Sequence, residues 1–94
     1  MNIFDVSGKV ILITGGGGVL GGSMAQHLLQ NGATVVILSR TEKSILNAVN
    51  RLKKISDNIS GFVCDVTDEK SLQATCDRIL EEHRSIDGLI NAAG

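Results

Sequence analysis

The sequence predicts an α/β fold with a doubly wound parallel sheet in which the strands lie in the order 3-2-1-4. Short continuous apolar runs alternate along the chain with segments of helical spacing, as in strands covered on both faces and the helices that connect them. The first apolar run leads directly into the glycine-rich segment 14–22 and then into a helical pattern. Right-handed crossovers wind such a chain into one sheet, with the first two helices on one face and the third on the other.

The first half of the chain supplies two strands and one helix. The first strand is expected over residues 9–14, because residues 10–13 are all apolar. A helix is expected over 20–31, where four small or apolar residues share one face, namely Gly21, Ala25, Leu28 and Leu29. Gly32 follows at the place where a left-handed residue commonly ends a helix. The second strand is expected over 34–39, which is again rich in Val, Ile and Leu.

The second half repeats the alternation. A helix is expected over 44–55 with a buried stripe of Ile45, Val49, Leu52 and Ile55, and a strand follows over 60–65. The third helix is expected to begin with Thr67 or Asp68 as its N-cap, and the residues at helical spacing are Leu72, Cys76, Ile79, Leu80 and His83. A short apolar run predicts the fourth strand over 89–91.

Composition narrows the classes of function. The formal net charge is −1 and no basic block is present, which argues against a nucleic-acid or anionic-membrane partner. Cys64 and Cys76 form no C-x-x-C pair, so neither a metal site nor a disulfide framework is expected. The start has no charged leader pattern, and no apolar run approaches the ~20 residues of a membrane span. We therefore expect a cytoplasmic protein.

The glycine-rich segment is typical of a site for the pyrophosphate of a dinucleotide. Glycine reaches positive φ without steric cost and lets backbone N–H groups approach phosphate oxygens, while the following helix directs its positive end at the anion. Two registers fit. The general pattern G-x-G-x-x-G begins at Gly16, whereas the pattern T-G-x-x-x-G-x-G begins at Thr14 and has Val19 in place of its middle glycine.

The second register, together with Asp65-Val66 and Asn91-Ala92-Ala93-Gly94, resembles the short-chain dehydrogenase/reductase family. The resemblance extends over essentially the whole chain. It implies a Rossmann-like fold and a nicotinamide dinucleotide cofactor, and the chain ends well before the resembling proteins do. Residues 1–94 are accordingly expected to be the amino-terminal, dinucleotide-binding portion of a longer single domain.

By this resemblance, the glycine segment would contact the pyrophosphate and a ribose. The contacts would come from Gly15, Gly17 and Gly18 and from the backbone of Val19 and Leu20. The alternative is a glycine turn that only packs the helix onto the strand. Val19 is β-branched and resists positive φ, so we expect it to enter the helix in right-handed geometry.

Ser39 and Arg40 end the second strand about 20 residues after the glycine segment, where an acidic residue would accept hydrogen bonds from the adenosine ribose of NAD. No carboxylate is present there, and the fork of a guanidinium suits a 2′-phosphate. NADP(H) is therefore expected to be preferred over NAD(H). The alternative is that Arg40 is simply an exposed residue at a helix start.

The remaining cofactor contacts are expected after the third and fourth strands. The resemblance implies that Asp65 accepts a hydrogen bond from the adenine amino group and that the backbone N–H of Val66 assists. Asp is also a common turn or helix-cap residue, which is the alternative for Asp65. Asn91, Ala92 and Gly94 would lie beneath the riboses, or else form a strand end of small residues.

The chemistry implied by the resemblance is hydride transfer between the cofactor and a small alcohol or carbonyl substrate, with a tyrosine as acid/base beside a lysine. The chain contains no tyrosine, so no catalytic residue is assigned. The run T-G-G-G-G-V-L-G-G-S-M-A resembles oxidoreductases of D-mannonate and fructuronate, and a homo-oligomer is expected for the complete enzyme. A non-catalytic dinucleotide-binding module or sensor is the alternative function.

Overall fold

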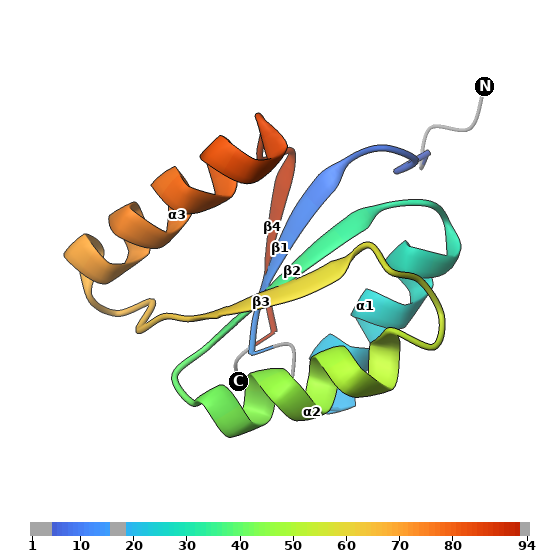
Figure 1. The fold of residues 1–94 in the computed structure, drawn as a ribbon, viewed down its shortest axis with the longest axis horizontal. Helices are drawn as coiled ribbons and strands as arrows, with labels where there is room; N and C mark the ends of the chain where they lie inside the picture. Colours follow the sequence, from blue (N-terminus) through green and yellow to red (C-terminus); the bar gives the residue numbers. More distant parts are fainter. Residues whose placement is uncertain (1–4, 16–18, 93–94) are drawn as a thin grey trace.

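The computed structural model describes residues 5–15 and 19–92. Figure 1 shows one twisted sheet with α3 on one side and with α1 and α2 on the other. Within the described residues, no helix has both the length and the apolar character needed to cross a bilayer. The elements follow in the order β1 (Val10–Thr14), α1 (Val19–Gln30), β2 (Thr34–Ser39), α2 (Glu42–Leu52), β3 (Ile59–Val63), α3 (Glu69–His83) and β4 (Gly88–Asn91).

The sheet is parallel throughout, and its strand order is β3-β2-β1-β4. In the centre of the sheet, Leu12 of β1 is paired with Val36 of β2 on one side and with Leu89 of β4 on the other. The predicted fold class and strand order are therefore confirmed. Because all four strands run in the same direction, their carboxyl ends meet at one edge of the sheet.

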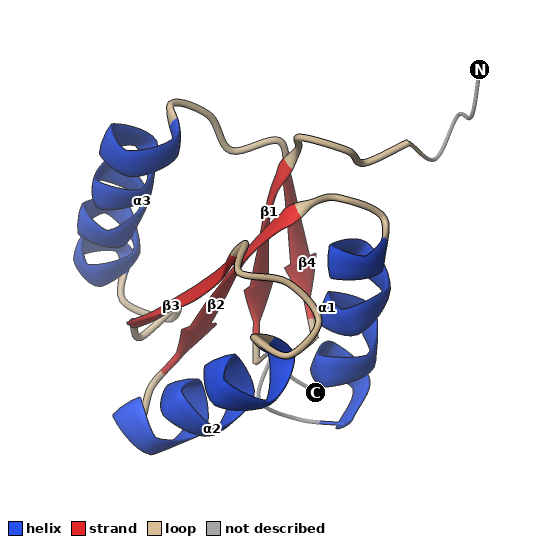
Figure 2. Cartoon of the chain, turned by 45° about the vertical axis from the view of Figure 1, so that its right-hand side comes forward, coloured by secondary structure: helices blue, strands red, loops and turns tan. Residues whose placement is uncertain are grey.

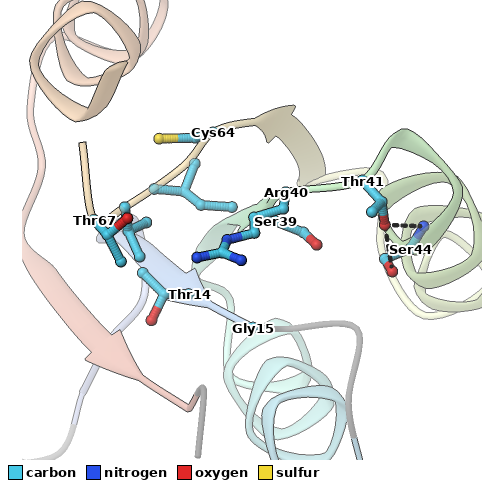
Figure 3. A pocket seen from close by; sticks show the side chains of 10 residues that line it. Thr14, Gly15, Ser39, Arg40, Thr41, Ser44, Cys64 and Thr67 are labelled. Carbon is cyan, nitrogen blue, oxygen red and sulfur yellow. Dashed lines mark hydrogen bonds between the residues drawn. The ribbon is translucent and has the colours of Figure 1, made fainter. Parts of the chain in front are cut away.

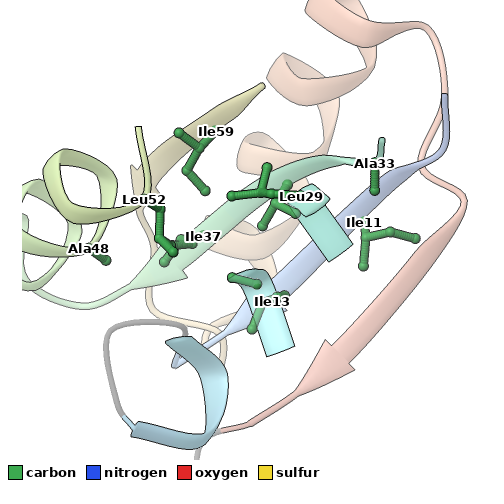
Figure 4. Packing of buried hydrophobic residues seen from close by; sticks show 10 residues of the cluster. Ile11, Ile13, Leu29, Ala33, Ile37, Ala48, Leu52 and Ile59 are labelled. Carbon is green, nitrogen blue, oxygen red and sulfur yellow. The ribbon is translucent and has the colours of Figure 1, made fainter. Parts of the chain in front are cut away.

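Alternate side chains of the strands enter two separate cores. Ile11 and Ile13 pack with residues of α1 and α2, and Figure 4 shows this cluster between the sheet and the helices. Val10 and Leu12 point to the other face, where they pack with Ile79 of α3. Figure 2 shows the same division, with α1 and α2 together on one face. Burial of one such side chain stabilises the fold by roughly 1.5–3 kcal/mol.

The first helix begins and ends much as predicted. Val19 is the first residue of α1, so it enters the helix as expected for a β-branched residue. Gly32 follows the helix at a φ of 87°, and its amide donates to the carbonyl of Leu29 at 3.1 Å. This left-handed residue lets the chain turn from α1 into β2.

The second helix lies earlier in the chain than predicted. Thr41 is its N-cap and accepts a hydrogen bond from the amide of Ser44, so the helix begins at Glu42. It ends at Leu52, which leaves Ile55 outside the helix with 37% of its surface exposed. The prediction that Ile55 belongs to the buried stripe is therefore wrong, and Ala48 completes the stripe with Ile45 and Leu52.

The third helix begins at the second of the two predicted caps. The side chain of Asp68 accepts from the amide of Lys70, and the helix runs from Glu69 to His83. Leu80 was expected on the buried face, but it is 42% exposed, whereas its neighbour Ile79 is fully buried. Leu80 lies about 100° of helical rotation past Ile79, and this turns it away from the centre of the buried face.

The beginnings of β1 and β4 are joined by Asp87, which the sequence patterns do not single out. Its backbone amide donates to the carbonyl of Val10 at 2.8 Å, and its carboxylate accepts from the amide of Val10, also at 2.8 Å. This pair satisfies the first backbone groups of β1. The side chain therefore sets where the pairing of β4 begins.

Gly61 provides the test of how closely α2 packs on the sheet. A Cβ added to Gly61 would collide with the Cγ2 methyl group of Ile45, which lies on the buried face of α2. We expect Gly61→Ala to lower the free energy of unfolding by about 1–3 kcal/mol because the core is overpacked. In an Ile45→Ala background the same change should cost at least about 0.5 kcal/mol less. Chemical denaturation of the four proteins measures this coupling, and additive effects would contradict the close contact.

Candidate functional site

The carboxyl ends of β1, β2 and β3 surround a cleft of about 360 Å³. In open α/β sheets, ligands bind outside this edge of the strands. Figure 3 shows the side chains around the cleft, which come from the last residues of the strands and from the segments that follow them. The lining residues are Thr14, Gly15, Leu38, Ser39, Arg40, Thr41, Ser44, Cys64, Val66 and Thr67.

The segment after β1 turns away from the sheet at Gly15. This residue has a φ of 70°, which a residue with a Cβ rarely adopts, and its amide donates to the carbonyl of Leu38 at 3.0 Å. The hydroxyl of Thr14 donates to the side-chain oxygen of Asn91 at 2.9 Å, and the amide of Ala92 donates to the carbonyl of Thr14 at 3.0 Å. Asn91 and Ala92 are thus held against the end of β1.

The segment after β2 brings an arginine and a helix N-terminus to the cleft. Thr41 caps α2 through its hydroxyl oxygen, which accepts from the amide of Ser44 at 3.4 Å, and the hydroxyl donates to the Ser44 hydroxyl oxygen at 2.8 Å. The side chain of Arg40 is 71% exposed. This segment therefore brings both a guanidinium and the positive end of a helix to the cleft, and each favours an anion.

The segment after β3 is shaped by the carboxylate of Asp65. Its Oδ1 accepts from the amide of Thr67 at 3.0 Å and from the hydroxyl of Thr67 at 2.6 Å, and the Asp65 amide donates to the hydroxyl of Ser71 at 3.3 Å. The turn role considered for Asp65 in the sequence is therefore present. The amide of Cys64 donates to the carbonyl of Ser39 at 2.8 Å, which attaches this segment to the end of β2.

One ion pair crosses the cleft between the second and third segments. The Nε of Arg40 lies 3.7 Å from Oδ1 of Asp65. The pKa of Asp65 is lowered, first by the hydroxyl of Thr67, next by the amide of Thr67, and less by the charge of Arg40. Burial acts in the opposite direction on this carboxyl. The turn, more than the arginine, lowers the pKa of Asp65.

The residues predicted for the cofactor fall into three groups in the structure. Four of them line the cleft, namely Gly15, Ser39, Arg40 and Val66. Asp65 is linked to the cleft by its ion pair with Arg40. Val19 and Leu20 are the first residues of α1, and Asn91 and Ala92 lie at the end of β4. Gly17, Gly18 and Gly94 lie outside the described residues.

Sequence reasoning did not assign Thr41, Ser44, Cys64 and Thr67 to the site. Thr41 and Ser44 stand three residues apart directly after Arg40, which is the spacing of an N-cap and its partner amide. Thr67 stands two residues after Asp65, which is the spacing of an Asx turn. The sequence therefore indicates a helix cap and a turn at these positions. Only the tertiary fold brings the four residues around one cleft.

Within residues 5–15 and 19–92, no three His, Cys, Asp or Glu side chains lie close enough together to hold a metal ion. Cys64 and Cys76 are both free thiols. Burial is the main cause of the raised pKa of Cys76, and the nearby Cys64 and Asp77 add to it. The thiol of Cys76 is therefore kept protonated at neutral pH.

Comparison with known proteins gives consistent matches along the chain. A family model described as short chain dehydrogenase matches residues 9–94. An uncharacterized oxidoreductase of Mycobacterium tuberculosis strain H37Rv is 35% identical over 92 residues, which make up 95% of this chain and 27% of that protein.

Two solved structures resemble this one closely. The 2-keto-3-deoxy-D-gluconate dehydrogenase of Streptococcus agalactiae has a TM-score of 0.89 at 36% identity, over 97% of this chain and 34% of that one. The 3-ketoacyl-(acyl-carrier-protein) reductase of Brucella melitensis, complexed with NADH, has a TM-score of 0.79 at 30% identity, over 89% of this chain and 34% of that one. The chain thus spans between 27% and 34% of the length of the three proteins.

The two neighbours of Asp65 should have unequal effects on its titration. Thr67→Val removes the hydroxyl and should raise the pKa of Asp65, whereas Arg40→Ala should raise it less, because the hydroxyl has the larger effect. The ionised turn is stable above the ordinary pKa of an unfolded Asp and is lost as the pH falls through the lower folded value. Carbon NMR titration of the carboxyl group measures both shifts. A larger rise in Arg40→Ala would contradict this order.

Proposed function

The chain belongs to the short-chain dehydrogenase family, and we propose that it is the cofactor-binding part of an oxidoreductase that uses a nicotinamide dinucleotide. The reaction proposed is hydride transfer between the cofactor and a small alcohol or carbonyl substrate. The observation that carries the proposal is the cleft at the carboxyl ends of β1, β2 and β3. The glycine turn at Gly15 and the guanidinium of Arg40 line this one space, and the carboxylate of Asp65 forms an ion pair with Arg40.

The backbone after β1 is the proposed contact of the pyrophosphate. Gly15 in its left-handed conformation leads the chain toward the N-terminus of α1, which begins at Val19 and Leu20. Amides at such a position favour a phosphate by direct donation and through the helix dipole. Gly17 and Gly18 belong to the same proposed contact by their place in the sequence.

The adenosine is proposed to lie between the ends of β2 and β3. Ser39 and Arg40 would face its ribose and carry the preference for NADP(H), because a guanidinium binds a 2′-phosphate and no carboxylate occupies this strand end. The Asp65 carboxylate uses Oδ1 for its hydrogen bonds to Thr67. Oδ2 is then the oxygen proposed for the adenine amino group, with the Val66 amide beside it.

The other end of the cofactor is proposed to pass the end of β4. Hydrogen bonds to Thr14 hold Asn91 and Ala92 in place next to β1. Gly94 follows them in the chain. The nicotinamide ring supplies or receives the hydride when the cofactor is bound. The proton of the reaction needs an acid/base that these residues do not include, since the chain has no tyrosine.

The partial coverage of the matched proteins leads to a further proposal about the whole protein. The chain covers about a third of the matched proteins, so we propose that residues 1–94 are the amino-terminal portion of a longer single domain. The complete protein is also proposed to be a cytoplasmic homo-oligomer. A sugar acid such as D-mannonate or fructuronate is the proposed substrate class, and the match to the Streptococcus enzyme supports it. A non-catalytic dinucleotide-binding module or sensor is the second candidate function, because the described cleft serves the binding of a cofactor whether or not a reaction follows.

Titration of the full-length protein with NADPH and with NADH, followed by nicotinamide fluorescence, tests the cofactor proposal. We expect both to bind and NADPH to bind more tightly. Failure of both to bind would refute a dinucleotide site. Oxidation of NADPH in the presence of fructuronate or a related keto acid separates the enzyme from the sensor, because a sensor binds the cofactor without turnover.

Arg40→Asp should reverse the cofactor preference of the full-length protein. The change replaces a phosphate-binding fork by a carboxylate that repels the 2′-phosphate and accepts from the 2′-hydroxyl of NAD. We expect the ratio of kcat/KM for NADP(H) over NAD(H) to fall by about tenfold to a hundredfold or more. The matched control is Arg51→Asp, at the far end of α2 and outside the cleft. An unchanged ratio in Arg40→Asp would remove Arg40 from the site.

A further inference from the structure

The guanidinium of Arg40 lies within the cleft in this structure. Arg40 follows β2 directly, yet its Nε is 3.7 Å from the carboxylate of Asp65 beyond β3. Figure 3 shows the guanidinium pointing toward the side of the cleft where Thr14 and Thr67 lie and away from Thr41 and Ser44. The side chain therefore bridges the space between the ends of the two strands.

The two partners of this ion pair are held very differently. The carboxylate of Asp65 is fixed by the amide and the hydroxyl of Thr67, at 3.0 and 2.6 Å. Arg40 has 71% of its side chain exposed, and its one described charged partner is this carboxylate. An exposed ion pair of this kind contributes little stability, so the arginine moves at low cost while the aspartate stays in place.

The proposed function needs both partners for other contacts. It assigns Arg40 to the 2′-phosphate and places the adenosine between the ends of β2 and β3, in the space that the Arg40 side chain now bridges. The present bridge therefore has to open when the adenosine enters. A 2′-phosphate compensates the lost ion pair with charge-assisted, bidentate hydrogen bonds to the guanidinium. A 2′-hydroxyl offers no such compensation.

We propose that Arg40 also selects against adenosine ligands without a 2′-phosphate, by bridging the cleft to Asp65 in competition with the adenosine. This inference rests on the proposed function and adds a second effect to the attraction of the phosphate. Arg40 would then act on specificity from both directions. It attracts NADP(H) and obstructs NAD(H).

The test compares adenosine with 2′-AMP, which differ only by the phosphate, on the full-length protein. NMR titration gives the Kd of each ligand for the unchanged protein, for Arg40→Ala and for the matched control Arg51→Ala, with thermal melts to verify folding. In Arg40→Ala we expect the affinity for 2′-AMP to fall about tenfold or more, because its charged partner is lost. The affinity for adenosine should rise about twofold to fivefold, because the competing ion pair is gone. Arg51→Ala should change neither Kd.

The possible failures are distinguishable. If 2′-AMP loses affinity while adenosine binds equally well or more weakly, Arg40 only attracts the phosphate, and the competition is refuted while the proposed site stands. If neither ligand binds the unchanged protein, the proposed cofactor site itself is wrong. A rise in adenosine affinity in Arg51→Ala as well would also refute the proposal, because the effect would then not depend on an arginine in the cleft.

Discussion

Every feature of the candidate site depends on the parallel register of the strands. Because β1, β2 and β3 run in the same direction, the chain leaves all three at one edge of the sheet. Three backbone hydrogen bonds just beyond the ladders hold these ends together, from Gly15 to Leu38, from Cys64 to Ser39 and from Ala92 to Thr14. A shift of one residue in any pair would exchange the faces of that strand and misplace the residues that follow it.

The site combines a rigid backbone arrangement with exposed charged side chains. This arrangement is made by backbone bonds and by local caps, such as Thr41 on α2 and the turn in which Asp65 accepts from Thr67. The charged groups at its surface are largely exposed, with Arg40 more so than Asp65. Such a division suits the binding of an anionic ligand, since the positions of the strand ends persist while the arginine side chain adapts.

The sequence was sufficient for the fold because each element carries its own strong signal. Short apolar runs such as 10–13 fit strands buried on both faces, and the small residues after the first strand allow a helix to pack closely. The predictions for Ile55 and Leu80 were wrong because an apolar pattern shows neither where a helix ends nor how far a residue is turned from the buried face. Ile55 continues the apolar spacing of α2, although the helix has already ended at Leu52.

The arrangement of the site was predictable only in part. Arg40 and Asp65 were assigned separately, by their places after two strands, but their ion pair depends on side-chain positions that no pattern encodes. Thr41, Ser44 and Thr67 carry ordinary turn chemistry, and only the tertiary fold makes them neighbours of one cleft. The anchor of β4 at Asp87 is equally invisible in the sequence, because its partner Val10 lies at the other end of the chain.

The central claim is that the edge formed by the carboxyl ends of the strands binds a dinucleotide. The most direct measurement is an NMR titration of the isotope-labelled full-length protein with NADP⁺, in which the backbone amide signals report the place of binding. Shifts concentrated at Gly15, Arg40 and residues 65–67 are the expected result. Shifts concentrated instead at the opposite edge, around Asn58 and His83, would contradict the claim.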